Sequence, residues 1–455
     1  MAAPQIPGNA LFVLRAAQGV FMDNTVEAQP RFAALIPFFV FVFFYVGLSI
    51  WAQDFYKVPM PVAFAVASAA AFFLNRKVPV DKKVNVYASG MGDSNIMLMC
   101  LIFILAGAFA AVAKTMGAVD AAVLITRSLI PAQFLLAGIF VISALISLAI
   151  GTSCGTIAAL TPIAVGLIAP MGIRPELMLG AVIGGAMFGD NLSMISDTTI
   201  AATRTQNVPM QEKFYANFKM VLPAALVVIV IYLLTGNSDY TGKLAGTVTW
   251  KHILLTVPYI LVLGLALYGV NVMTLLFFGV LFSCILGICV GAFDIWGALN
   301  ACGQGTLGMA ETLIVAILAG GLLKLIRGNG GIAYLMEKIR KAIHSSRGCE
   351  VGVFLLVSMI NLFTANNTVA IVIAGPIAKE LSDRYKCEPR RIASILDTAS
   401  CFVQGLIPYG AQMLIAVGVA KTSGLAVSTL GLLGTQYYQW LMLAAVIVAF
   451  LRRKK

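Results

Sequence analysis

The sequence Gly151-Thr-Ser-Cys-Gly-Thr156 interrupts an apolar stretch that runs from residue 132 to residue 171. A second apolar stretch, 351–381, is interrupted in the same way by Thr364-Ala-Asn-Asn-Thr368. Irregular polar backbone is tolerated at membrane depth only where it is buried in protein or lines a cavity. We therefore predict that each stretch folds as a re-entrant hairpin whose polar tip lies inside the protein.

The composition around these stretches indicates a membrane protein. Of the 455 residues, 60% are hydrophobic and 11% are charged, whereas a soluble protein carries about a quarter charged residues. The net charge of +12 would suit a nucleic-acid partner, but the Lys and Arg residues lie in short clusters between apolar runs. Those runs have the length of about 20 residues that crosses a bilayer core. The sequence therefore predicts an all-α polytopic membrane protein whose partner is the lipid bilayer and not a nucleic acid.

Ten apolar segments are flanked by polar or basic residues and are predicted to span the membrane. They are 31–55, 58–75, 93–113, 178–202, 218–236, 252–270, 272–290, 309–327, 391–417 and 435–451.

The N-terminal segment, 1–30, has no basic region ahead of its one apolar patch. We therefore expect no cleaved signal peptide and assign membrane targeting to the first spanning helix. The eight cysteines form no CxxC pair and are accompanied by two histidines only. This pattern predicts neither a transition-metal site nor a disulfide framework.

The two halves of the chain resemble each other in sequence. A shift of 214 residues lays Pro162 and the two residues after it on Pro376 and its successors, and a shift of 213 lays Leu105-Ala-Gly107 on Leu318-Ala-Gly320. Each half also has the same order of elements: three spans, a hairpin, a broken span and a final span. Because a hairpin adds no crossing, each half crosses five times, and an odd number makes the second half enter from the opposite side. We therefore predict two inverted-topology repeats, 31–236 and 252–455, joined by a linker at 237–251.

The charges of the connecting loops favour the same inversion. Loop 76–83 holds four Lys or Arg residues and its repeat counterpart, 291–296, holds none. Loop 384–391 also holds four, and its counterpart, 171–176, holds one. Because cytoplasmic loops carry the excess of Lys and Arg, equivalent loops are predicted on opposite faces. The same rule predicts that both termini are cytoplasmic, with 452–455 as a basic tail.

The most polar sequence at membrane depth is Gly189-Asp-Asn-Leu-Ser-Met-Ile-Ser-Asp-Thr-Thr199, within a predicted broken helix at 178–202. A buried carboxylate is costly in a membrane and marks an ion or proton path. Asp190 and Asp197 are about two helical turns apart, so both would face one side of an unbroken helix. A break near Gly189 would instead free backbone carbonyls beside Asp190. We predict a cation or proton site here, and the alternative is an extramembrane loop with two solvated carboxylates.

The hairpin tips supply neutral hydrogen-bonding groups that form a second candidate site. Helix N-termini that begin after each tip would suit an anionic group, and unwound carbonyls would suit a cation. Alternatively, these small residues only let the helices pack closely. The candidates are Thr152, Ser153 and Thr156 in the first tip and Asn366, Asn367 and Thr368 in the second.

The second half has its own break, in the predicted broken helix 391–417. At an offset of 214, Gln404 takes the place of Asp190, so charge is concentrated in the first half. Asp397 is either a second titratable site or a helix-capping carboxylate. The proton-carrying candidates are therefore Asp190, Asp197 and Asp397.

These motifs resemble those of the NhaC-type sodium/proton antiporters, within the ion transporter superfamily. The residues that carry the resemblance are GTSCGT (151–156), TPIAVG (161–166) and GDNLSMISDTTIAATRTQ (189–206), with ANNTVAIVIAGPIAK (365–379) and LDTASCFVQGLIPYGAQ (396–412) in the second half. The resemblance implies a transport site that includes Asp190, Asn191, Ser193, Ser196, Asp197 and Thr198.

The resemblance also implies an elevator-type fold, in which a transport domain moves against a scaffold, often in a homodimer in the bacterial cytoplasmic (inner) membrane. The chain departs from the family pattern at Met194, where Pro is frequent, and at Ile200, where Asn is frequent. Members of the wider group move organic anions or amino acids, so the resemblance specifies the fold more closely than the substrate.

Our leading hypothesis is a secondary antiporter that exchanges Na⁺ for H⁺ at a shared carboxylate, with these ions at the same positions and no cofactor. The second hypothesis is Na⁺- or H⁺-coupled transport of a small organic solute. Repeats and hairpins favour alternating access over a channel. No histidine is placed for a catalytic triad, which argues against an enzyme, and no GxxxxGK[ST] motif is present for ATP.

Overall fold

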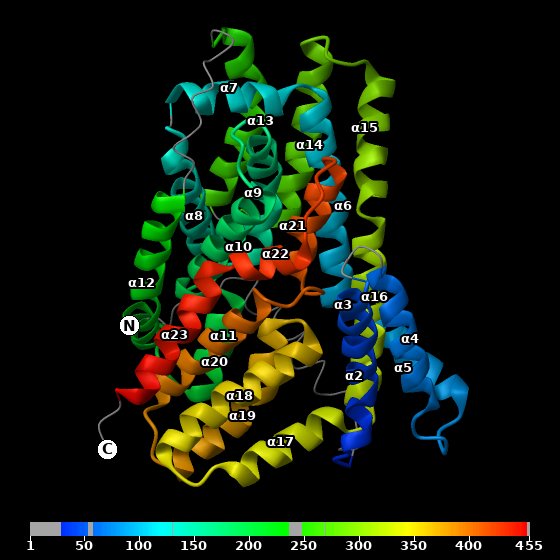
Figure 1. Ribbon diagram of the computed structural model, residues 1–455, viewed down its shortest axis with the longest axis vertical. Helices are drawn as coiled ribbons and strands as arrows, with labels where there is room; N and C mark the ends of the chain where they lie inside the picture. The colour runs from blue at the N-terminus through cyan, green and yellow to red at the C-terminus, as the bar shows by residue number, and fades with distance from the viewer. Residues whose placement is uncertain (1–28, 53–57, 130, 236–247, 269, 453–455) are drawn as a thin grey trace, which may run out of the picture.

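The computed structural model describes residues 29–52, 58–129, 131–235, 248–268 and 270–452 (Figure 1). Within these residues every regular element is a helix. Most of the predicted N-terminal segment and of the predicted linker, and residues 453–455 of the predicted basic tail, lie outside the described residues.

The first half begins with a helical segment that contains a 3₁₀ turn and a π-helical turn, and then follows the predicted order. Its elements are η1 (Phe32–Leu35), α2 (Ile36–Val42), η2 (Phe43–Gly47), α3 (Leu48–Trp51), α4 (Met60–Phe73), α5 (Val80–Met91), α6 (Ser94–Thr115), α7 (Ala118–Leu129), α8 (Ala132–Ile150), α9 (Ser153–Ile168), α10 (Pro175–Leu192), α11 (Asp197–Gln206) and α12 (Met210–Thr235).

The second half has the same order of elements, except that it ends in a bent pair where the first half ends in one helix: two apolar helices, a two-part helix, an amphipathic helix, a helical hairpin, a broken helix and the final pair. Its elements are α13 (Trp250–Leu267), α14 (Val272–Cys289), α15 (Ile295–Gly308), α16 (Ala310–Gly328), α17 (Gly331–Ala342), α18 (Ser346–Thr364), α19 (Asn367–Arg384), α20 (Pro389–Gln404), α21 (Ala411–Thr422), α22 (Thr429–Thr435) and α23 (Tyr437–Leu451).

Local sequence explains where many of these helices begin. Proline occupies the first residue of α10 and of α20, where its missing N–H costs nothing and its fixed φ suits a helix. A side-chain oxygen accepts a backbone N–H at the start of other helices, which satisfies one of the four free donors of a helix N-terminus. These caps are Asp93, Ser196, Asn271, Asp294, Ser345, Asn366 and Ser428.

The chain turns at both polar patches that interrupt the apolar stretches. Between α8 and α9, Gly151 has a φ of +75°, which glycine adopts without strain. Between α18 and α19 the equivalent residue is Ala365, with a φ of +46°. A left-handed conformation costs a non-glycine residue roughly 1–2 kcal/mol. The tip of the second hairpin is therefore a strained turn, held by the packing of the residues around it.

Six helical segments among the described residues are long and apolar enough to cross a membrane, or up to eight if each of two bent pairs counts as one span. The bent pairs are α15 with α16, at 41°, and α22 with α23, at 48°. Two of the six, α8 and α18, belong to the predicted hairpins, and the predicted spans that do not meet the criterion among the described residues are 31–55, 58–75, 252–270 and 391–417. The count of ten crossings therefore stays a prediction.

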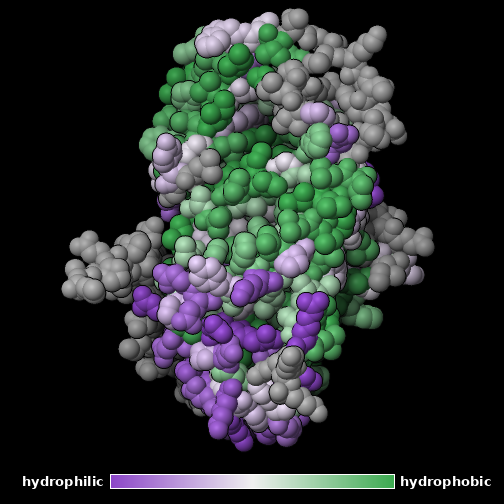
Figure 2. Space-filling model, turned by 90° about the vertical axis from the view of Figure 1, so that its left-hand side faces the viewer, coloured by the Kyte–Doolittle hydropathy of each residue, from purple (hydrophilic) through white to green (hydrophobic). Residues whose placement is uncertain are grey.

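The helices gather into two groups (Figure 1). On one side lie α2, α4, α5, α6, α14, α15 and α16, and on the other lie α8, α10, α11, α12, α18, α19, α20 and α23. Figure 2 shows an apolar surface over the upper and middle parts of the molecule and a hydrophilic surface at the lower end, where α17–α20 lie. An apolar band of this kind is the surface that a bilayer covers.

Candidate functional site

The first hairpin is packed tightly on the broken helix α10–α11. A Cβ built on Gly189 of α10 would lie 2.6 Å from the Cβ of Ser147 on α8. The Oγ of Ser147 donates a 2.6 Å hydrogen bond to the carbonyl of Ala186. Glycine on α10 thus lets α8 approach closely, as small residues do at membrane helix interfaces. This packing brings the tip of the hairpin to the C-terminal end of α10.

Asp190 lies at that meeting point and is 3% exposed. Its carboxylate accepts a 2.7 Å hydrogen bond from the Oγ of Ser153, a 3.3 Å bond from the N–H of Ser153 and a bond from the Oγ of Ser196. Ser153 is the first residue of α9 and Ser196 is the N-cap of α11. Two helix N-termini therefore direct donors at one buried carboxylate, which stabilises negative charge there.

Hydrogen bonds connect Asp190 to the second half of the chain. Gln412 donates to the Oγ of Ser153 at 3.0 Å, and Gln404 donates to the Oε1 of Gln412 at 2.8 Å. Gln404 also donates to the carbonyl of Ala365, in the second hairpin tip, at 2.9 Å. Among the described residues, the buried Oε1 of Gln404 has no hydrogen-bond donor. The structure therefore joins both tips and both breaks in one polar cluster with a spare acceptor oxygen.

Asp397 forms a second buried cluster, which sequence reasoning found only in part. Its carboxylate is fully buried in the interior of α20, so it does not cap that helix. It forms an ion pair with Lys213 of α12, which is 1% exposed, and accepts a 3.1 Å hydrogen bond from Asn217. Lys213 also donates to the carbonyl of Asn191 at 2.7 Å and to the Oγ1 of Thr199 at 2.6 Å.

Lys213 and Asn217 are not among the site residues predicted from the sequence, because they precede the predicted span at 218–236 and resemble polar residues at a membrane boundary. In the structure α12 begins at Met210, so both residues lie within the helix. Their spacing of four residues, which places them on one face, is the signal that could have revealed them.

The break in the first half lies one turn later than expected. Gly189 and Asp190 are helical, and the break runs from Ser193 to Ser196. Asp190 and Asp197 consequently do not share a helix face: Asp190 is buried, whereas Asp197 is exposed at the first residue of α11. Of the two alternatives drawn from the sequence, an unbroken helix and a break, the structure has the break, although it follows Leu192 and not Gly189.

The remaining predicted residues near the first tip are buried or half-buried and bind neighbouring groups. Asn191 donates to Thr398 at 3.4 Å, and Ser193 donates to the carbonyl of Leu148 at 2.9 Å. Thr198 and Ser196 share a 2.9 Å hydrogen bond between hydroxyls. Thr156 donates to the carbonyl of Thr152, which is the N-cap of α9.

The predicted residues of the second tip bind their own helix. The side chain of Asn366 caps α19 by accepting from the N–H of Val369 at 3.0 Å, and Asn367 accepts from the N–H of Thr368 at 3.1 Å. The tip reaches the Asp190 cluster through the carbonyl of Ala365 and not through these side chains.

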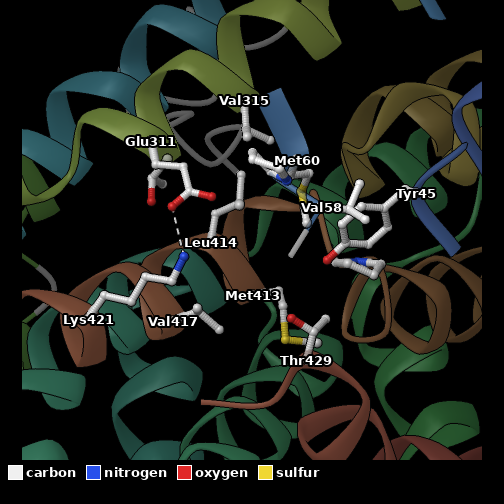
Figure 3. Close-up of a pocket in the computed structure, with 13 residues that line it drawn as sticks. Tyr45, Val58, Met60, Glu311, Val315, Met413, Leu414, Val417, Lys421 and Thr429 are labelled. Carbon is white, nitrogen blue, oxygen red and sulfur yellow. Dashed lines mark hydrogen bonds and ion pairs between the residues drawn. The ribbon is translucent and has the colours of Figure 1, made fainter. Parts of the chain in front are cut away.

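A cavity of about 220 Å³ lies beside the second break (Figure 3). Glu311 on α16 and Lys421 on α21 form a 2.8 Å ion pair at one side of it (Figure 3). Apolar side chains make up most of its remaining wall, with the hydroxyl-bearing Tyr45 and Thr429 at one side (Figure 3). The cavity therefore lies between α16, of the first group of helices, and α21, with one ion pair in its wall.

Comparison with known proteins gives one family match and several relatives. A model described as "Na+/H+ antiporter family" matches residues 24–237 and 243–451. The Na(+)/H(+) antiporter NhaC of Bacillus subtilis is 27% identical over 401 residues, which cover 80% of this chain and 86% of that protein. The malate-2H(+)/Na(+)-lactate antiporter of the same organism is 24% identical and covers 92% of this chain and 94% of its own. The arginine/ornithine antiporter ArcD of Halobacterium salinarum is 25% identical and covers 76% and 78%.

Proposed function

The chain belongs to the Na⁺/H⁺ antiporter family, and from this premise we propose that Na⁺ and H⁺ bind in turn at Asp190. The resemblance to NhaC-type antiporters that the motifs indicate is confirmed by the family match and by the NhaC relatives. The protein is accordingly a membrane transporter of the antiporter class.

One observation carries the assignment to Asp190: this buried carboxylate is surrounded by hydroxyl and amide groups from both halves of the chain. Oxygen ligands of this kind suit a hard cation such as Na⁺. The hydroxyls of Ser153 and Ser196 now donate to the carboxylate, and on rotation they would offer lone pairs to a bound ion. The free oxygen of Gln404 supplies a further neutral ligand.

Competition for this carboxylate would couple the two fluxes. A proton on Asp190 removes the charge that binds Na⁺, and a bound Na⁺ disfavours protonation of the same group. Since an unneutralised carboxylate is costly at membrane depth, the loaded states move more readily than the empty one. Asp197 and the remaining predicted residues of the two tips are proposed to line the path to this site.

A second candidate function is the exchange of a small organic solute. The cavity between α16 and α21 supports it, because the Glu311–Lys421 pair offers one negative and one positive group to a zwitterion or a carboxylate (Figure 3). Two relatives are named as organic-solute antiporters. Uptake of labelled amino acids and dicarboxylates by vesicles would distinguish this function from ion exchange alone.

We further propose that the two halves are inverted repeats. Two close contacts support this proposal: Gly90 meets Gly320, and Gly107 meets Gly305. At the offsets of 213 and 215, Gly107 corresponds to Gly320 and Gly90 to Gly305, so each contact is the repeat image of the other. The basic α4–α5 loop also lies at the opposite end of the molecule from the α14–α15 loop (Figure 1).

In this proposal the α5–α6 and α15–α16 pairs form the scaffold of an elevator, and the two hairpins move with the two broken helices. The protein would function as a homodimer in the cytoplasmic membrane. The described C-terminal end of the chain lies at the same end of the molecule as the basic loops (Figure 1), which supports a cytoplasmic C-terminus.

The function is tested with proteoliposomes that contain a pH-sensitive dye. The wild type should acidify or alkalinise the lumen in response to a Na⁺ gradient, and Asp190→Asn should not, because the amide can neither exchange a proton nor attract Na⁺ by charge. Asp383→Asn is the matched control, since Asp383 lies on the surface in an ion pair with Lys379. A fully active Asp190→Asn protein would overturn the assignment, and elution as a single species on size exclusion would exclude misfolding.

A further inference from the structure

The buried ammonium of Lys213 lies in a pocket of oxygen atoms that resembles a cation site. The oxygens come from three helices: the carbonyl of Asn191 on α10, the hydroxyl of Thr199 on α11 and the carboxylate of Asp397 on α20. Both charged side chains are 1% exposed or less. A carbonyl, a hydroxyl and a carboxylate are the ligand types that bind Na⁺ or Li⁺ in proteins.

The break in the first half creates this pocket. Because α10 ends at Leu192, the carbonyl of Asn191 has no intrahelical partner and points out of the negative end of the helix. Asn217 donates to the same carbonyl at 2.9 Å. The pocket is also next to the proposed transport site, since Asn191 directly follows Asp190.

We propose that this pocket is a second monovalent-cation site, and that Lys213 keeps it filled with its own ammonium group. The chain then transports one cation per cycle although two buried carboxylates, Asp190 and Asp397, lie at the broken helices. The inference rests on the proposed function in one respect only: the proteoliposome experiment described below measures transport. The binding of a cation in the pocket does not depend on it.

The charges of the cluster lead to the stoichiometry. Asp190 and Asp397 contribute two negative charges and Lys213 contributes one positive charge, which leaves one negative charge. One Na⁺ or one H⁺ neutralises it, so the exchange of one for the other moves no net charge. The thiol of Cys401 lies 3.7 Å from Asp397 and adds no charge while protonated.

The test is equilibrium binding of radioactive Na⁺ to purified protein. Wild type and Lys219→Met, a control on the exposed face of α12, should each bind one Na⁺ per chain. Lys213→Met should bind two, because the vacated pocket retains its carboxylate. Lys213→Met combined with Asp397→Asn should return to one. A Lys213→Met protein that binds no more Na⁺ than the wild type would overturn the proposal.

A second measurement requires only the wild type, in case Lys213→Met does not fold. Exchange in proteoliposomes should be independent of a potassium diffusion potential set with valinomycin. Exchange that speeds up or slows down with that potential would overturn the inference but leave the proposed function standing. Absence of any Na⁺-driven proton movement would overturn the proposed function, and the binding comparison between wild type and Lys213→Met would still decide the inference.

Discussion

The close approach of α6 and α15 predicts a large difference between two glycines of the same helix. A Cβ built on Gly305 would overlap the carbonyl of Gly107 and lie 2.8 Å from the Cβ of Ala111. A Cβ built on Gly303, half a turn earlier, meets nothing within 4 Å. Gly305→Ala therefore has to separate two helices, whereas Gly303→Ala changes only the helix itself.

The magnitude follows from two opposing effects. Replacing glycine by alanine in a helix interior stabilises it by about 1 kcal/mol, and this gain applies at both positions. Overpacking of a well-packed contact costs about 1–3 kcal/mol, and here the obstacle is backbone that cannot rotate away. Gly303→Ala should be neutral or slightly stabilising, and Gly305→Ala should be less stable than Gly303→Ala by about 1–3 kcal/mol.

Thermal unfolding of the two variants in one detergent, followed by size exclusion or by an intrinsic fluorescence signal, measures this difference. We expect Gly305→Ala to unfold several degrees below Gly303→Ala. Under the proposed repeat, Gly320→Ala should show a loss of similar size, because its Cβ would lie 2.7 Å from the carbonyl of Gly90. If Gly305→Ala is as stable as Gly303→Ala, the helices are not in contact there and the packing argument is refuted.

Two further substitutions test the site and its scaffold. Ser153→Ala removes a hydroxyl that donates to the ionised carboxylate of Asp190. Since a hydrogen bond to a charged group contributes about 1.5–3 kcal/mol, its loss favours the protonated carboxyl, and the apparent affinity for competing Na⁺ at fixed pH should fall roughly tenfold to a hundredfold. The exposed Ser89→Ala is the control. Lys83 donates to the carbonyls of Phe72 and Leu74 at the end of α4. Lys83→Met should therefore lower the unfolding temperature. Lys82→Met, at an exposed neighbour, is the control and should leave the unfolding temperature unchanged. Equal unfolding temperatures for the two lysine variants would contradict this capping role.

The breaks could be located from the sequence because polar and glycine residues stand out in apolar surroundings. Residues 151–156 and 364–368 each fall at a turn in the structure. Asp190 could be identified for the same reason: a carboxylate in an apolar run has few structural explanations. The position of the break after Asp190 could not be predicted, since Gly189 marks close packing against α8 and not the end of a helix.

Residues outside the apolar runs were the ones that sequence reasoning missed. The helix α5 precedes the predicted span at 93–113, and its polar composition hid its contact with α16. Lys213 was hidden in the same way, because a lysine near the start of an apolar run is ordinarily a boundary residue. Its role depends on Asp397, which lies 184 residues later in the sequence, and no local pattern joins them.

The polar cluster is less symmetric than the helices that hold it. Under the proposed repeat, Gln404 takes the place of Asp190, and at the same offset Asp397 takes the place of the apolar Ile183. Each broken helix therefore contains one buried carboxylate, at a different depth along the helix. Two equivalent carboxylates would demand two cations per cycle. Under the proposed function, the position of Asp397 in the helix interior, where Lys213 forms an ion pair with it, would leave Asp190 as the single carboxylate that binds the transported ion.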